Sequence, residues 1–331
     1  MLEVIAPGIL ATIQDAGRPG FAHLGVPRSG ACDPEALAIA NILLGNRPDA
    51  PCIEVTIGGL EVLAVETCAV GIAGADLGAV LRPAGRRLVP GVTCLVPAGS
   101  RILFEGAARG APGARAYVAL AGGIDVPLVL DSAATYAPAG LGGIEGRALR
   151  TGDRIVPSAR GDVAAVGRIW PLEGVAAGDL PARLPVVRGP HPDWFTADAF
   201  ATLLAADWAV SPDSDRVGVR LVGPPLPRSG AGELVSCGMA RGAIQVPSGG
   251  APIILSADHQ TVGGYPVLAV VPTVGHARLG QLRPGEAIRF EEVDVEQAQR
   301  ALRLRAEALA RAAAVLDEDA VWDRLALEAG G

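Results

Sequence analysis

Short apolar or alternating runs, bounded by glycine or proline, recur along the whole chain. Examples lie at residues 53–57, 60–65, 101–104, 114–120, 253–255 and 267–271. Short strands separated by turn signals at this spacing are typical of an all-β sandwich or barrel, whereas a βαβ array alternates strands with long helical patterns. The pattern therefore predicts a mostly β fold with few helices.

Three segments carry helix signals instead. Pro34 suits the first position of a helix over residues 34–44, and Thr196 is a suitable N-cap for a second helix over residues 197–206. A long helix is predicted over residues 295–315, because Asp294 and Gln297 have the spacing of a capping box. Residues 317–331 could form one more short helix.

The stretch between Pro157 and Leu184 is rich in glycine and proline and mixed in polarity, which indicates a boundary. The sequence therefore predicts four parts. They are an N-terminal β domain (1–157), a linker (158–183), a C-terminal β domain (184–292) and a helical tail (293–331).

The amino-acid composition argues against several classes of function. The chain has 331 residues, of which 50% are hydrophobic, and a net charge of −7. An acidic chain is a poor candidate for nucleic-acid binding, because phosphate binding favours a basic surface. All 28 basic residues are arginines. This excludes a Schiff-base lysine, a phosphate-loop lysine and a biotin-attachment lysine, so any bound anion must meet arginine, a backbone amide or a metal.

Cysteine usage and the N-terminal sequence bear on the compartment. Five cysteines, none in a CxxC pair, suggest neither a disulfide scaffold nor a cysteine zinc site. A basic region followed by an apolar run is absent from the first residues, and apolar runs stop short of 18 residues. We therefore expect a soluble cytoplasmic protein without a membrane partner.

The densest group of candidate functional residues lies between Asp213 and Gln281. A polar side chain in an apolar run must find partners, either in a site or in a buried network, and both interpretations stay open for the four residues Gln245, Asp258, Gln260 and Gln281. Arg216 and Arg220 could bind a carboxylate or phosphate, or else pair with Asp213 or Asp215. A smaller polar group near the N-terminus comprises Gln14, Asp15 and Arg18.

Several segments together resemble the biotin-dependent carboxyltransferase family, in particular the C-type subunits of 5-oxoprolinases and the KipA-like proteins. The resemblance rests on TIQDAGRPGFAHLGVPRSGACDPEALAIANILLGN, ARAYVALAGGIDVP, SDRVGVRLVG, GAIQVPSGGAPIIL, DHQTVGGYPVLAVV and QLRPGEAIRF, which keep the family's order over residues 3–292. The chain departs from the pattern at Cys237 and His276, where the family has acidic residues.

The resemblance implies a fold of cyclophilin-like β-barrel domains and an ATP-dependent hydrolase. The chain would be the C-type subunit of a 5-oxoprolinase that converts 5-oxoproline, ATP and water to glutamate, with magnesium. It would act with B-type (KipI-like) and A-type subunits and be inactive alone. The alternatives are a KipA-like regulator of a KipI-like partner, and the acceptor side of a biotin-dependent carboxyltransferase with a urea-like substrate.

Under this resemblance, side-chain chemistry suggests a role for each candidate. Asp258 is the predicted general base or magnesium ligand, Tyr265 a stacking group or hydroxyl donor, and Gln260 a recognition group for the reacting amide. Substrate binding is assigned to the remaining candidates: Arg216 and Arg220 for anionic groups, Gln245 and Gln281 for amides, and Gln14, Asp15 and Arg18 from the first half.

Overall fold

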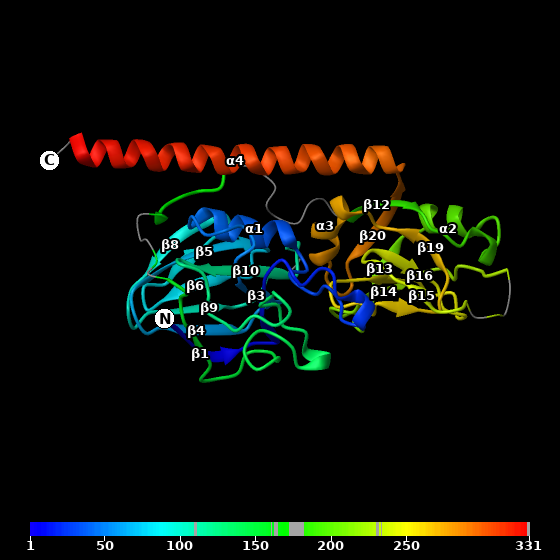
Figure 1. Cartoon of the computed structure of the whole chain (residues 1–331), viewed down its shortest axis with the longest axis horizontal. Coiled ribbons are helices and arrows are strands. Elements are labelled where there is room, and N and C mark those ends of the chain that lie inside the picture. The colour runs from blue at the N-terminus through cyan, green and yellow to red at the C-terminus, as the bar shows by residue number, and fades with distance from the viewer. Residues whose placement is uncertain are drawn as a thin grey trace. The chain divides into compact units, whose positions relative to one another are not determined.

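The computed structural model describes residues 1–108, 111–159, 161, 165–171, 182–229, 232 and 234–329, with side chains as far as residue 316. The chain divides into two compact units. Unit 1 comprises Met1–Ala16, Pro34–Ala177 and Arg303–Gly331, and unit 2 comprises Gly17–Asp33 and Gly178–Leu302. Several strands of each unit are labelled in Figure 1.

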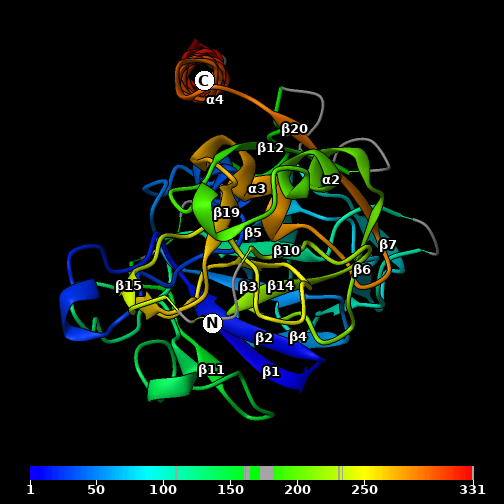
Figure 2. The same cartoon turned by 90° about the vertical axis from the view of Figure 1, so that its right-hand side faces the viewer.

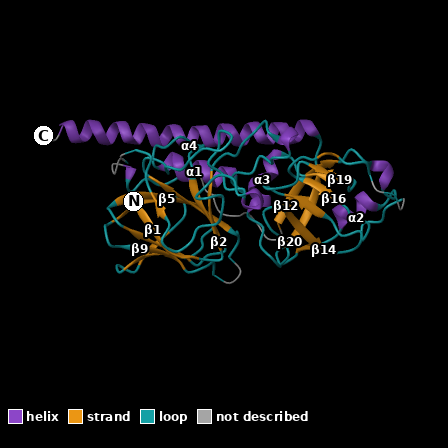
Figure 3. Ribbon diagram, turned by 60° about the horizontal axis from the view of Figure 1, so that its bottom comes forward, coloured by secondary structure: helices purple, strands orange, loops and turns teal. Residues whose placement is uncertain are grey.

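Unit 1 is built from two antiparallel sheets (Figure 3, strands in orange). The larger has the order β11-β1-β4-β9-β6-β7, with bounds Arg154–Ile155, Leu2–Pro7, Leu60–Ala64, Arg101–Phe104, Ala79–Arg82 and Arg86–Leu88. The smaller has the order β2-β3-β10-β5-β8, with bounds Leu10–Gln14, Cys52–Thr56, Arg115–Leu120, Cys68–Gly74 and Val92–Val96. Apolar side chains from both sheets form one buried core.

Helix α1 (Pro34–Leu43) buries its apolar residues in unit 1, among them Leu37, Ile39 and Leu43. Its bounds agree with the predicted helix over residues 34–44. Helix α2 (Ala199–Ala205) of unit 2 also lies where a helix was predicted, but it begins differently. Its N-cap is Asp198, whose carboxylate accepts a hydrogen bond from the Thr196 hydroxyl at 2.6 Å.

Unit 2 is a closed barrel of seven strands, of which β12, β14, β19 and β20 are labelled in Figure 2. Its order is β12-β19-β16-β17-β14-β13-β20, with bounds Ala182–Arg188, Val267–Val270, Ala243–Gln245, Ile253–Leu255, Gly218–Val222, Trp208–Val210 and Ala287–Glu292. The parallel pair β12–β20 closes the barrel. Alternate residues of β12, including Leu184 and Val186, fill its core together with Ile244, Ile254 and Ile288.

Shorter elements complete unit 2. The strands β15 (Cys237–Gly238) and β18 (Val262–Gly263) pair outside the barrel, and helix α3 (His276–Gly280) precedes β20. The 3-10 turns of unit 2 are η1 (Ala22–Leu24), η4 (Pro192–Trp194) and η5 (Thr273–Gly275), and unit 1 contributes η2 (Ala137–Ala139). The predicted mostly β fold with a barrel is thus confirmed.

Helix α4 runs from Val295 to Ala329 as one element, so the short separate helix predicted for residues 317–331 is a continuation of it. Its capping box is present. The backbone N–H of Gln297 donates to Asp294 Oδ1 at 2.7 Å, and the backbone N–H of Asp294 donates to Gln297 Oε1 at 2.9 Å. None of the described helices combines the length and the apolar character needed to cross a membrane.

The compact units differ from the predicted division in two respects. Residues Gly17–Asp33 belong to unit 2, and the long helix is divided between the units rather than forming a tail of its own. The first difference has a clear physical cause, because side chains of unit 2 hold the segment 28–33 through hydrogen bonds to its main chain. Most of the predicted linker, including residues 172–181, lies outside the described residues.

Candidate functional site

A buried ion pair between Arg216 and Asp258 lies at the centre of the polar residues of unit 2. Arg216 Nε donates to Asp258 Oδ2 at 2.8 Å, and Nη2 donates to Oδ1 at 3.1 Å. Both residues are buried, with 8% and 5% of their surfaces exposed. Asp215, one of the predicted partners of Arg216, accepts the backbone amides of Val217 and Gly218 through its Oδ1.

The same pair fixes the segment from Arg28 to Asp33. Ser29 Oγ donates to Asp258 Oδ1 at 2.6 Å, and Arg216 Nη2 donates to the Gly30 carbonyl at 2.7 Å. Both oxygens of Asp258 are therefore engaged, which favours a positioning role over proton abstraction. The role of Asp258 as a base stays a prediction.

Two more side chains hold this segment. Arg241 donates through Nη1 to the Ala31 carbonyl at 3.2 Å and through Nη2 to the Cys32 carbonyl. Gln281, which follows helix α3, donates through Nε2 to Asp33 Oδ2 at 2.7 Å. Helix α3 approaches closely here because Gly280 has no side chain, and a Cβ at that position would lie 2.1 Å from the Cys32 carbonyl oxygen.

A second polar group contains the predicted glutamines Gln245 and Gln260. Gln260 Nε2 donates to Gln245 Oε1 at 3.0 Å, and Gln245 Nε2 lies 3.3 Å from Met239 Sδ and 3.5 Å from the Tyr265 carbonyl oxygen. Gly263 permits this arrangement, because a Cβ there would lie 2.8 Å from Gln245 Nε2. Gln245 is buried, whereas Gln260 and Tyr265 are exposed, so both could meet a ligand.

The charge of Arg241 acts on two histidines, His259 and His276. Burial, followed by the charge of Arg241, lowers the pKa of His276 to about 3, with Arg28 and His259 adding to the effect. Burial also lowers the pKa of His259, whose Nδ1 lies 2.7 Å from the Gln260 carbonyl oxygen. Both imidazoles are therefore neutral at pH 7 and can accept or donate a hydrogen bond.

The structure does not place all predicted residues in this group. Gln14 and Asp15 belong to unit 1, where Asp15 accepts hydrogen bonds from the Ser132 hydroxyl and the Ala133 amide and Gln14 Nε2 donates to the Thr135 carbonyl. Arg18 belongs to unit 2 and is buried, and its amide donates to the Arg28 carbonyl at 2.8 Å. Arg220 lies on β14 with its side chain exposed, apart from the buried Arg216.

The principal site residues that sequence reasoning missed are Ser29 and Arg241. Nothing in the spacing of the sequence indicates that Ser29 and Asp258 are in contact, because 229 positions separate them. One local signal is present for Ser29, since a serine before Gly30 in a proline-flanked loop is compatible with a left-handed turn, and its φ is 54°.

In the described part of the chain, no group of three or more His, Cys, Asp and Glu residues is placed to hold a metal ion. The sequence also lacks a phosphate-loop lysine. Asp258, the predicted magnesium ligand, is already bound to Arg216 and Ser29.

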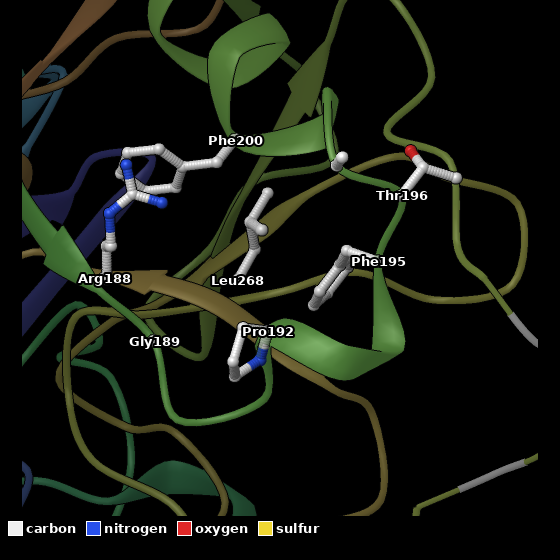
Figure 4. Close-up of a pocket in the computed structure, with 8 residues that line it drawn as sticks. Arg188, Gly189, Pro192, Phe195, Thr196, Phe200 and Leu268 are labelled. Carbon is white, nitrogen blue, oxygen red and sulfur yellow. The ribbon is translucent and has the colours of Figure 1, made fainter.

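A separate cavity of about 200 Å³ lies on unit 2 and is lined by Phe195, Phe200 and Leu268 (Figure 4). The Arg188 guanidinium lies over the Phe200 ring, 4.0 Å from its centroid, and pairs with Glu292 at 2.8 Å. Hydrocarbon walls and an arginine that already has a carboxylate partner suit a small apolar group better than an anion. This cavity therefore differs in chemistry from the polar group around Asp258.

These features define a barrel unit that carries an arginine-rich, amide-containing site. The family described as "carboxyltransferase domain, subdomain A and B" matches residues 24–292. The chain belongs to this family.

The similarity to individual relatives agrees with this family assignment. The chain is 37% identical over 303 residues to the C subunit of 5-oxoprolinase from Escherichia coli (strain K12), covering 91% of this chain and 94% of that protein. The solved structure of the protein TTHA0988 matches with a TM-score of 0.76 and 34% identity, covering 88% of this chain and 55% of that one. The K. lactis urea amidolyase matches with a TM-score of 0.86 and 26% identity, covering 94% of this chain and 20% of that one.

The chain thus spans little more than half of the first of these solved structures and a fifth of the second. Two of these relatives are a 5-oxoprolinase subunit and a urea amidolyase, which supports an enzyme-related role.

Proposed function

We propose that this chain is the C-type subunit of an ATP-dependent 5-oxoprolinase, acting with B-type and A-type subunits in the cytoplasm. The observation that carries the proposal is the similarity to the C subunit of a 5-oxoprolinase over 94% of that protein's length. The reaction would convert 5-oxoproline, ATP and water to glutamate, ADP and phosphate.

The chemistry of the site is compatible with this substrate. A lactam offers an N–H donor and a C=O acceptor, and the exposed Gln260 amide, held by Gln245, can pair with both. The substrate also carries a carboxylate, which requires cationic or N–H partners. ATP is a co-substrate, and we propose that the assembled complex binds it with magnesium.

Reconstitution tests the proposal directly. Glutamate formation from 5-oxoproline and ATP should require this chain together with its A-type and B-type partners, and each component alone should be inactive. Gln245→Ala should lower the rate about tenfold or more, since the buried hydrogen bonds of an amide contribute on the order of 1–3 kcal/mol. The exposed Gln299→Ala is the matched control and should leave the rate unchanged.

The structural match to urea amidolyase favours a second candidate, the acceptor side of a biotin-dependent carboxyltransferase. Biotin would have to arrive on another chain, because this one has no lysine. An assembled complex that releases no glutamate but carboxylates a urea-like acceptor from biotin would replace the first proposal with the second.

A further inference from the structure

Three consecutive residues of the segment 28–33 are buried, and among the described residues no acceptor is found for their main-chain N–H groups. Ser29 and Ala31 are each 3% exposed, and Gly30 is buried as well. Within the part of the chain that the structure describes, the amide nitrogens of these three residues donate no hydrogen bond. Buried N–H groups are almost always paired in folded proteins, so three adjacent exceptions call for a physical reason.

The reason lies in how the carbonyl groups are held. Arg216 binds the Gly30 carbonyl, and the Arg18 amide donates to the Arg28 carbonyl at 2.8 Å. In a trans peptide the C=O and the following N–H point in opposite directions. The N–H groups of Ser29 and Ala31 are therefore directed away from the groups that bind these carbonyls.

The conformation of the turn is itself costly. Ser29 has a φ of 54° and Gly30 a φ of 83°, so two successive residues lie in the left-handed region. For a residue other than glycine this conformation is unfavourable, because Cβ comes too close to the following carbonyl oxygen. The hydrogen bond from Ser29 Oγ to Asp258 stabilises it. Strain that the surrounding structure maintains in this way is typical of sites that bind a ligand.

We propose that the backbone amides of Ser29, Gly30 and Ala31 form a binding site for an oxyanion. Consecutive main-chain N–H groups in a turn form anion-binding concavities. Arg216 and Arg241 bind carbonyl groups of the same segment. The charge of Arg241 favours an anion near this segment, whereas the charge of Arg216 is balanced by Asp258. Burial is the main cause of the lowered pKa values of His259 and His276, and the charge of Arg241 lowers both further.

The ligand chemistry is that of a small oxyanion, either the carboxylate of the substrate or a phosphoryl group. The assignment of 5-oxoproline as the carboxylate source rests on the proposed function, whereas the anion site itself does not. In this arrangement Asp258, Arg216 and Ser29 are positioning residues for the turn.

Amide-resolved NMR of the full-length chain tests the site without a partner. The probes are inorganic phosphate, 5-oxoproline, and pyrrolidinone, which has the lactam but no carboxylate. We expect saturable downfield shifts of the amide protons of Ser29, Gly30 and Ala31 with phosphate or 5-oxoproline and none with pyrrolidinone. Leu130 and Asp131 form a second left-handed turn, which is exposed, and their amides serve as the control for non-specific ion effects.

The outcomes separate the two anion sources. A response to 5-oxoproline identifies a carboxylate site, and a response to phosphate alone identifies a phosphoryl site. Ser29→Ala should weaken either response about fivefold or more, through loss of the hydrogen bond that fixes the turn. The proposal is overturned if these amides respond to neither anion, or if they shift no more than those of Leu130 and Asp131.

The inference and the proposed function can fail separately. Shifted amides in a chain whose assembled complex makes no glutamate would retain the anion site and remove the 5-oxoprolinase function. Glutamate formation by the assembled complex, without amide shifts in this chain, would retain the 5-oxoprolinase function and remove the anion site.

Discussion

Arg216 is the residue on which the local architecture of the site depends most. Its guanidinium binds the carboxylate of Asp258, the carbonyl of Gly30 and the sulfur of Cys32, the last at 3.2 Å. A planar fork of five donors can serve such different acceptors at once, which a lysine could not do. Arg216 therefore forms an ion pair, as one of its two interpretations predicted, but with Asp258 in place of Asp213 or Asp215.

Replacement of Arg216 by alanine should destabilise the protein by about 3–5 kcal/mol, because Asp258 would be left buried without its ion-pair partner. Arg220→Ala is the matched control, since this neighbouring arginine is exposed, and it should change the stability by less than about 0.5 kcal/mol. Chemical denaturation of the three proteins measures both values. Equal stability of the two variants would contradict the assignment of Arg216 as a positioning residue.

The sequence singled out several polar residues of unit 2 that are buried, but it did not indicate how they are paired. Gln245, Asp258 and Gln281 stood out because they interrupt apolar runs, and all three are buried. Their partners lie far away in the sequence, with 248 positions between Gln281 and Asp33 and 42 between Arg216 and Asp258. Local patterns carry no information on such pairs, because the fold alone brings them together.

At the level of elements, the sequence predicted a structural feature correctly where the residues that form it lie close together in the chain. The Asp294–Gln297 capping box defines the start of α4 as predicted, because both partners lie within one helical turn. The closure of the barrel is different, since it depends on the parallel pairing of β12 with β20, whose paired residues Ala182 and Ile288 are distant in sequence. Strand patterns predict a barrel as a class but not which strands close it.

Removal of the cap should affect the first turn of α4 specifically. Asp294→Ala should destabilise that turn by about 1 kcal/mol, because the Gln297 amide loses its acceptor. Hydrogen exchange at Gln297 and Ala298 should then be about fivefold faster, while the core amides of the barrel are unchanged. Gln299→Ala, an exposed change within the same helix, should leave exchange at Gln297 as it is. Unchanged exchange in Asp294→Ala would show that the cap contributes nothing.

At the scale of the whole molecule, the chain does not divide into consecutive domains. Unit 2 includes Gly17–Asp33 from the N-terminal region as well as the barrel. A boundary inferred from composition cannot reveal this, because the segment 17–33 resembles any other Gly- and Pro-containing loop. Its assignment follows from tertiary hydrogen bonds such as Arg241 to the Ala31 carbonyl.

The half-buried His276 makes the stability of the folded protein depend on pH in the acidic range. His276 has a pKa of about 3 when folded, against about 6.5 in an unfolded chain, so the unfolded state binds the proton more readily. The contribution to stability is therefore fully present above pH 6.5 and is lost progressively as the pH falls from 6.5 towards 3, at up to about 1.4 kcal/mol per pH unit.

His276→Gln should remove this contribution to the pH dependence. The loss of stability between pH 7 and pH 4.5 should be about 1–3 kcal/mol smaller in the variant than in the parent protein, even if the variant is less stable at pH 7. Denaturation curves at a series of pH values measure the difference, and His23→Gln, at an exposed position, should reproduce the parent profile. A His276→Gln profile parallel to that of the parent would show that His276 is protonated equally well in the folded and unfolded states.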